Sequence, residues 1–390
     1  MKHHHSITRP TTLYTISVVS FFVALHVALP NYFNSSFLGT LVQEKTISLV
    51  YFIAAIITIF GFLSMHSILR KLGNYKVAII LVSLQVLIFY GIIFSKSAIA
   101  IAPLIILAIV VVNLIGFTLD IFLEKSSSTD KIGAIRGNYM TVTNSAWILG
   151  PLLGGILILG NDYKGIYVAA FGLLFPLLYL IKKNFSHFVD PAYPQITFRQ
   201  TLLSVLKNKD ISKLWIANIA LQVFYAWMTV YTPIYLSKNL GFDWDQIGII
   251  FTIMLVPFVL TQIPLGKLAD RRFGEKEIMA IGYIIMGIST AILAFCTTKN
   301  VAIWAILLFI TRIGASAVEI MIETYFFKKV DQKDSEILGA FRVTRPLSFL
   351  IAPVLTTVGL VFVAESYLFI LLGILCLITL IPVALLKDTR

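Results

Sequence analysis

Two sets of polar and ionisable side chains with identical spacing lie inside apolar stretches of this chain. The sets are Asn113, Asp120 and Glu124 in the first half and Arg312, Glu319 and Glu323 in the second half. Offsets of seven and eleven residues place each set within about 20° of one direction on a helix. Charges in such stretches are costly in a membrane and usually face a bundle interior or a wet cavity. The repeat therefore predicts a polar seam between two similar halves, suited to solute binding, charge pairing or proton transfer.

The composition indicates the elements that must position these side chains. The 390 residues are 58% hydrophobic and 13% charged, with a mean hydropathy of +0.90. A soluble domain averages about 25% charged residues, and an all-helical soluble protein would not need so many long uncharged runs. Runs of roughly 20 apolar residues suit membrane-spanning helices, and they exclude a membrane barrel with short alternating strands. We expect an all-α membrane protein.

The apolar runs predict twelve spans in two sets of six. Their expected ranges are 13–33, 44–66, 76–95, 97–121, 138–160, 164–182, 213–236, 245–266, 277–297, 301–325, 341–363 and 366–386. The predicted units are a cytoplasmic tail (1–12), a six-helix bundle (13–182), a cytoplasmic linker (183–212), a second six-helix bundle (213–386) and a cytoplasmic tail (387–390). Basic and apolar residues alternate near the end of the linker, which predicts an amphipathic helix at the membrane surface.

The positive charge of the chain is distributed by loop. The net charge is +12, and most Lys and Arg lie at the N-terminus, in alternate loops and at the C-terminus. The intervening loops hold only Lys45, Lys96, Lys164, Lys238 and Lys299. This asymmetry predicts a multi-pass protein of the cell (plasma or inner) membrane with both termini in the cytoplasm. The positive charge therefore reflects membrane topology, and we expect no nucleic-acid partner. The run His3-His4-His5 is a tag remnant or a tail and is left out of the argument.

A loop rich in glycine and charge follows the eighth span. It reads Gly266-Lys-Leu-Ala-Asp270-Arg271-Arg272-Phe-Gly274. With this loop the chain resembles the Major Facilitator Superfamily, in which such a loop joins the second and third helices of each half. The resemblance implies two pseudo-symmetric six-helix bundles, a central cavity lined by spans one, four, seven and ten, and a latch function for this loop. Gly266 would permit close helix approach, and Gly274 a tight turn.

The first half departs from that family pattern. Its loop keeps the turn glycine, Gly73, but Arg70 stands where the acid belongs. Any latch in the first half must therefore use other residues.

Span five contains a run of small residues around a proline. The run is Gly150-Pro151-Leu-Leu-Gly154-Gly155, in which small residues four apart allow tight helix packing. It is similar to part of the motif that exporters of the family carry in this span. That resemblance favours efflux, in the drug/metabolite–proton antiporter branch; ordinary small-residue packing is the alternative.

Charged residues at the cytoplasmic ends of the spans predict a gate. The gate candidates are Asp120, Glu124, Arg136, Glu319, Glu323, Arg342 and Arg345, with Gly266, Asp270, Arg271 and Gly274 of the latch loop. Acid–arginine pairs across the halves would close the cytoplasmic side, and each must break when that side opens. Proton carriage by an acid such as Asp120 or Glu319 and passive stabilisation are the alternatives.

Arg312 and His26 lie near the middle of their spans. A guanidinium at this depth requires an anion, carbonyls, an aromatic face or water. We expect Arg312 to bind a negative or polar group of the solute; neutralisation by carbonyls or by Tyr225 and Trp227 is the alternative. His26 is a candidate for proton coupling or a packing residue. The other expected cavity residues are Asn113, Asn144, Gln222, Tyr225, Trp227 and Tyr231.

The sequence contains no nucleotide-binding loop, catalytic triad or metal-binding cluster, and Cys296 and Cys376 are expected to be reduced thiols. We therefore expect no enzyme, no cofactor and no metal. The first hypothesis is a monomeric secondary active transporter that exports a small molecule by alternating access, coupled to protons. The alternatives are a proton-coupled importer of a small organic anion or sugar, and a sensor or scaffold of the same fold that does not transport.

Overall fold

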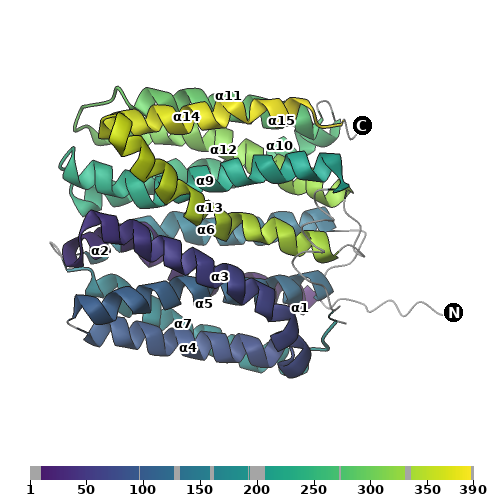
Figure 1. Cartoon of the computed structure of the whole chain (residues 1–390). Coiled ribbons are helices and arrows are strands. Elements are labelled where there is room, and N and C mark those ends of the chain that lie inside the picture. The colour runs from purple at the N-terminus through teal and green to yellow at the C-terminus, as the bar shows by residue number, and fades with distance from the viewer. Residues whose placement is uncertain are drawn as a thin grey trace.

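The computed structural model describes residues 10–95, 97–126, 132–158, 162–191, 193, 207–271, 274–329 and 335–387. Within these ranges a few helical side chains are not described, among them those of Glu124, Arg136, Asp270, Arg271 and Arg342. The described segments are helices joined by short connections (Figure 1). The expected amphipathic helix of the linker falls on residues outside this description.

The helices of the first half are α1 (Pro10–Asn31), α2 (Asn34–Leu41), α3 (Glu44–Leu72), α4 (Asn74–Phe94), α5 (Ala98–Ser126), α6 (Ile132–Leu157) and α7 (Lys164–Phe185). Those of the second half are α9 (Lys209–Lys238), α10 (Trp244–Arg271), α11 (Glu275–Leu293), α12 (Val301–Lys329), α13 (Ser335–Phe362), η2 (Glu365–Tyr367), α14 (Leu368–Ile378) and α15 (Leu380–Ala384). Twelve described segments are long and apolar enough to cross a membrane, which confirms the expected spans.

Both ends of the chain lie at the same end of the molecule, on the right in Figure 1. We name this the terminal end and the opposite one the far end. α1 and α9 run from the terminal end to the far end, and α7 and α15 return. An even number of crossings in each half produces this arrangement.

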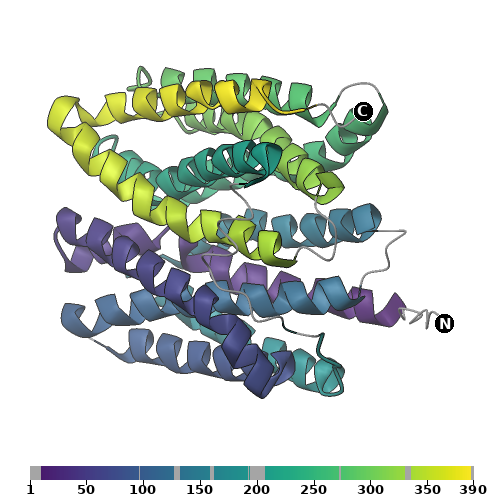
Figure 2. The ribbon, with the colours of Figure 1, turned by 45° about the vertical axis from the view of Figure 1, so that its right-hand side comes forward.

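The two halves are related by a pseudo-twofold pattern of packing. α1 packs on α6 as α9 packs on α13, α3 on α5 as α10 on α12, and α4 on α7 as α11 on α14. The main contacts between the halves, α6 with α10 and α3 with α13, also exchange under the same correspondence. Figures 1 and 2 show the two bundles one above the other. A seam between twin bundles is therefore present where the sequence repeat required one.

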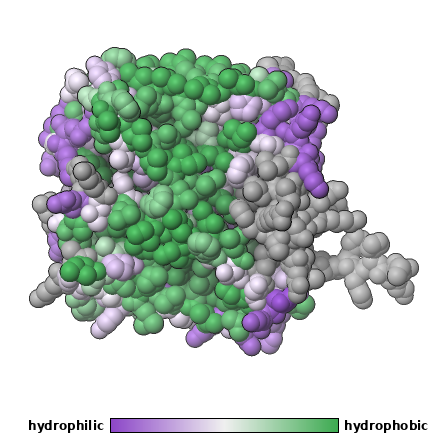
Figure 3. Space-filling view, viewed as in Figure 1, coloured by the Kyte–Doolittle hydropathy of each residue, from purple (hydrophilic) through white to green (hydrophobic). Residues whose placement is uncertain are grey.

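The outer surface suits a lipid environment. Large apolar side chains such as Leu87 on α4, Phe175 on α7 and Ile288 on α11 are exposed. Figure 3 shows hydrophobic residues across the middle of the visible face and hydrophilic ones towards the two ends. Burial against lipid replaces burial in a protein core for this belt.

The first span is longer than the sequence suggested. Pro30 interrupts the regular hydrogen bonding near the end of α1, and the amide of Phe33 donates to the carbonyl of Pro30 in a turn (3.0 Å). α2 then continues the same crossing to Leu41, whereas the expected span ended at residue 33. The proline thus bends the first span without ending it.

Candidate functional site

Three adjoining cavities lie along the seam between the halves. The vestibule has a volume of about 290 Å³, the central pocket about 190 Å³ and the side pocket about 70 Å³. Gln222 and Glu319 line both the vestibule and the central pocket, and Arg345 borders all three cavities. Arg345 therefore stands at the point where the compartments meet.

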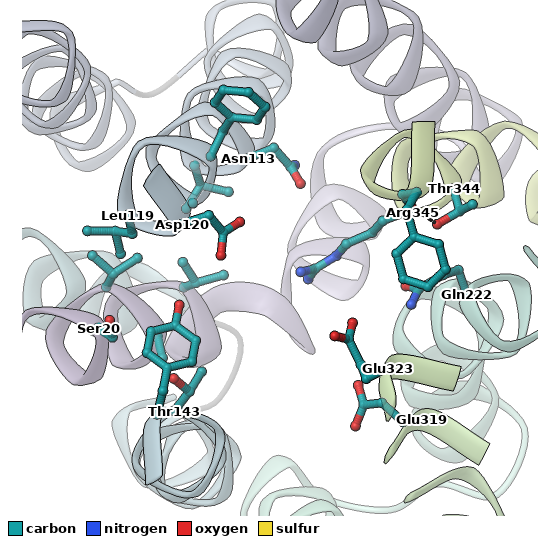
Figure 4. A pocket seen from close by; sticks show the side chains of 18 of the residues that line it. Ser20, Asn113, Leu119, Asp120, Thr143, Gln222, Glu319, Glu323, Thr344 and Arg345 are labelled. Carbon is teal, nitrogen blue, oxygen red and sulfur yellow. Dashed lines mark hydrogen bonds between the residues drawn. The ribbon is translucent and has the colours of Figure 1, made fainter. Parts of the chain in front are cut away.

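The vestibule contains the ionisable face of both halves. Asp120 on α5 lies across the hollow from Glu319 and Glu323 on α12 (Figure 4). Arg345 reaches from α13 into the space between the two sides and is exposed to it. Asp120, Glu319 and Glu323, the acids of the two repeated sets whose side chains are described, thus face one shared cavity and not the lipid. This arrangement would allow the guanidinium of Arg345 to pair with an acid of either half.

The central pocket contains a buried arginine. The side chain of Arg312 is 2% exposed. Its guanidinium lies 4.8 Å from the centre of the Phe224 ring and donates a long hydrogen bond to Oγ1 of Thr311 (3.3 Å). Among the described residues it makes no ion pair. Most of the donors of the guanidinium therefore remain available to an anion in the pocket.

A chain of hydrogen bonds crosses the seam beside this pocket. Nδ2 of Asn144 on α6 donates to Oε1 of Gln262 on α10 (3.1 Å). Nε2 of Gln262 donates in turn to Oε2 of Glu319 on α12 (3.2 Å). The first residue belongs to one half and the other two to the second half. The charge on Glu319 is therefore connected directly to a contact between the bundles.

Contacts between the bundles also gather towards the far end. The rings of Tyr32 and Phe251 have centres 5.1 Å apart, and those of Phe33 and Trp244 5.8 Å apart. A Cβ at Gly155 on α6 would lie 2.8 Å from the carbonyl oxygen of Trp244. Only glycine allows this approach of α6 to α10. These contacts separate the central pocket from the far end.

The model of the Major Facilitator Superfamily matches residues 214–390. Among solved structures, the nucleoside transporter NupG is similar with a TM-score of 0.74 at 11% sequence identity, over 96% of this chain and 99% of that chain. No curated protein sequence matches significantly. The family match covers the second bundle, and the shared fold extends over both. Residues 214–390, which form the second bundle, thus match the Major Facilitator Superfamily, and the likeness to NupG shows that the whole chain shares the fold. Twelve described segments that are long and apolar enough to cross a membrane fit a multi-pass membrane protein.

Several of the expected solute-binding residues come together in this structure. Arg312, Gln222, Tyr225 and Asn144 line the central pocket. Asn113 lines the vestibule and the side pocket. The walls include α3, α6, α10 and α13 in addition to the four spans that the family resemblance implied, because these helices make the contacts between the halves.

Two aromatic residues of the expected set lie elsewhere. Tyr231 donates to the carbonyl of Glu365 (3.1 Å) near the far end and packs on Phe369. Trp227 is buried against Tyr231. Neither lines one of the three cavities described here. A solute-binding role for Trp227 and Tyr231 therefore stays a prediction without support from these cavities, and the aromatic ring beside the Arg312 guanidinium is that of Phe224.

The proton-coupling candidates separate into two places. Asp120 and Glu319 face the vestibule, whereas His26 is fully buried beside the side pocket. Of the gate candidates, Glu323 and Arg345 also face the vestibule. The side chains of Glu124, Arg136, Asp270, Arg271 and Arg342 lie outside the described part of the structure, so the ion pairs proposed for them stay predictions.

The latch glycines differ from the expectation. A Cβ at Gly266 would meet nothing within 4 Å, so this glycine makes no close helix contact in the present conformation. Gly274 precedes α11 with φ −71° and ψ 165°, a conformation that any residue adopts, so it forms no glycine-specific turn. In span five, by contrast, a Cβ at Gly150 would collide with Ala28 of α1, and one at Gly154 with Phe33 in the turn between α1 and α2.

The missing acid of the first-half loop is supplied from elsewhere in the chain. Gly73 has φ +78°, and the next amide, of Asn74, donates to Oδ1 of Asp190 (2.7 Å). The hydroxyl of Tyr193 donates to the same oxygen (2.5 Å). Asp190 thus caps the N-terminus of α4 from the segment after α7. Burial, and next the hydrogen bond to Asp190, raise the pKa of Tyr193, which therefore stays a neutral donor.

Sequence reasoning missed several residues of the site. Among them are Tyr32 and Gln262 of the central region and Tyr51 and Gln85 of the side pocket. A glutamine inside an apolar span is the signal that identifies Gln85 and Gln262, because an uncharged amide in lipid also needs partners. The tyrosines carry no comparable signal, since many tyrosines of such chains lie at interfaces.

Proposed function

We propose that this protein is a secondary active transporter whose solute is a small organic anion bound in the central pocket. The observation that carries the proposal is Arg312, buried at mid-span without an ion pair among the described residues and adjoining a pocket that Arg345 also lines. An unpaired guanidinium is costly at this depth, and a carboxylate or phosphate offsets that cost with paired hydrogen bonds. The pocket is therefore complementary to an anion.

Glu319 is the proposed coupling group. It lines the same pocket as the two arginines and accepts the hydrogen bond that ends the chain from Asn144 through Gln262. A charged Glu319 competes with a solute anion for Arg345, and a protonated one leaves Arg345 to the solute. Protonation and solute binding would then favour each other, as coupled transport of a proton with an anion requires.

Alternating access would use the contacts at both ends of the seam. If the termini are cytoplasmic, as the distribution of basic residues predicts, the vestibule faces the cytoplasm and the far-end contacts close the outside. Closing the vestibule would bring Arg345 and Asp120 of opposite halves together, while α6 and α10 separate at Gly155. Because the proton and the anion move together in this scheme, an inward proton gradient would drive import, the alternative that the sequence left open. The efflux direction predicted from the family resemblance would instead require the proton and the anion to compete for the site.

Counterflow into proteoliposomes tests the proposal. Proteoliposomes that contain the purified protein are loaded with one unlabelled carboxylate, nucleoside or neutral sugar at a time. Uptake of the same compound in labelled form is then compared among the three classes. We expect counterflow for carboxylates alone. In the variant Glu319→Gln, counterflow should persist while a pH gradient no longer drives accumulation. Transport of nucleosides or sugars in preference to every anion would contradict the proposal, and binding without any counterflow would favour a sensor.

A further inference from the structure

The side pocket is a branch of the central cavity that enters the first bundle. It lies among α1, α3, α4, α5 and α7, and Arg345 and Phe349 of α13 form its border with the second bundle. Arg345, Phe349 and Asn31 also line the central pocket. A solute whose anionic group lies beside Arg345 therefore has direct access to the side pocket with the rest of its structure.

Three side chains bordering this pocket are buried with unused polar atoms. His26 is 0% exposed, Gln85 1% and Tyr51 4%. Both ring nitrogens of His26, Oε1 of Gln85 and the hydroxyl of Tyr51 have no hydrogen-bond partner. Buried polar groups are nearly always paired, so a group of unpaired ones around one cavity indicates an occupant. Their positions on α1, α3 and α4 place them on several walls of the same space.

Nearby groups satisfy these atoms at most in part. Carbonyls of Phe22 and Val23 lie beside His26 on its own helix, and the hydroxyl of Ser35 lies beside that of Tyr51. A carbonyl can accept from only one ring nitrogen of a neutral histidine, and a pair of hydroxyls leaves lone pairs unused. These side chains therefore retain hydrogen-bonding capacity for a group that enters the cavity.

Three other polar side chains of the side pocket, those of Asn34, Asn113 and Tyr167, already have hydrogen-bond partners. The hydroxyl of Tyr167 donates to Oδ1 of Asn34 (2.5 Å), and Nδ2 of Asn113 donates to the carbonyl of Ile109 (2.7 Å). The lining includes Arg345 at the border but no described carboxylate. What remains is a mixture of donors and acceptors on neutral side chains, which matches a hydroxyl group because a hydroxyl both donates and accepts.

We propose that the side pocket binds the hydroxyl-bearing part of the transported anion, whose charged group lies between Arg312 and Arg345. The inference rests on the proposed function and narrows its substrate class to small hydroxy acids and sugar acids. His26, Tyr51 and Gln85 then recognise hydroxyls, and the proton-coupling role of His26 is replaced by a binding role. The acids that face the vestibule lie outside this pocket, which separates recognition from coupling.

The border of the pocket connects this recognition to the transport cycle. Tyr51 on α3 stacks on Phe349 on α13 with ring centres 5.9 Å apart. The stack joins the two bundles, so the pocket is complete only while α3 and α13 are together. A hydroxylated solute therefore stabilises this arrangement, and separation of the helices opens the pocket.

Matched pairs of probes test the inference. Counterflow of D-glycerate is compared with propionate, and that of D-gluconate with hexanoate, so that each pair differs in hydroxyl groups at constant chain length. We expect at least one hydroxylated member to be transported with about tenfold higher kcat/KM than its partner. Tyr51→Phe and Gln85→Leu should each reduce the ratio of the two kcat/KM values, hydroxylated over plain, to about threefold or less. Thr58→Val, a buried substitution on α3 away from the pockets, is the control and should keep the preference.

The outcomes distinguish the two proposals. Transport of plain carboxylates as fast as their hydroxylated partners overturns the side-pocket inference and leaves the anion transporter intact. Absence of counterflow for every anion overturns the proposed function itself. A preference that survives both substitutions also overturns the inference, because transport of the plain carboxylate shows that the variants are folded.

Discussion

Equivalent positions in the two bundles carry different chemistry. Asn113 on α5 and Arg312 on α12 occupy the same place in the repeat, yet Nδ2 of Asn113 is paired to its own helix through Ile109. Arg312 instead presents a buried positive charge to the central pocket. At this position of the repeat the first bundle thus supplies a neutral amide and the second a charge. The repeated fold fixes the direction of equivalent side chains. Because the residue types at these positions differ, each half can bind a different end of one solute.

The loops between the second and third helices of each half differ in a related way. In the first half, Asp190 caps Asn74, whose Nδ2 also donates to the carbonyl of Thr118 (2.9 Å). In the second half, buried Glu275 pairs with Lys328 at the end of α12 (2.5 Å). Both sets of contacts connect the start of the third helix of a half to its fourth helix. The contacts of the first half also involve the segment after α7, whereas the ion pair of the second half lies within its own bundle.

The charge difference predicts the largest effect. Arg312→Gln should reduce anion counterflow about 100-fold or more, because it removes the charge that binds the solute. The matched change Asn113→Leu should cost less than about fivefold, since the amide is already occupied by its own helix. Counterflow at equal amounts of reconstituted protein measures both. Equal losses in the two variants would mean that the halves contribute alike, contrary to the comparison.

The comparison of Gly155 on α6 with Gly266 on α10 predicts an effect of intermediate size on counterflow. Gly155→Ala should slow counterflow about tenfold, because its Cβ would meet the backbone of α10 and separate the far-end contact. Gly266→Ala should stay within about twofold, since its Cβ enters open space. Counterflow and thermal stability of both proteins measure this. If Gly266→Ala slowed counterflow more than Gly155→Ala, the comparison would be contradicted, and Gly266 would contact a neighbouring helix in another state of the transport cycle.

The turn glycines predict the smallest effect, on stability. Gly73→Ala should lower the free energy of unfolding by about 1–2 kcal/mol, because the left-handed φ of +78° is strained for alanine. The new Cβ would also lie 2.6 Å from Oδ2 of Asp190. Gly274 has φ −71°, so alanine there carries no such backbone cost. Thermal unfolding in detergent compares the two, and an equal decrease would contradict the assignment of strain to the first half.

The sequence predicted the number of spans and the inward face of the repeated sets well, because lipid forces both long apolar helices and internal placement of charge. Helical geometry also argues against Tyr231 in the cavity, since nine residues from Gln222 place it about 180° away on α9. Thr229, seven residues from Gln222, does line the central pocket. The contact of Gln262 with Asn144 and Glu319 was not predictable, because it depends on how α6, α10 and α12 meet across the seam.

Arg345 borders the vestibule, the central pocket and the side pocket at once. A cation shared by three compartments links their occupancies thermodynamically, and such linkage is reciprocal. An anion lodged near the vestibule acids would draw the guanidinium towards itself and loosen the hold on a molecule deeper inside. An anionic inhibitor bound in the vestibule would then lower the affinity of the protein for its solute, even where the inhibitor and the solute do not contact each other.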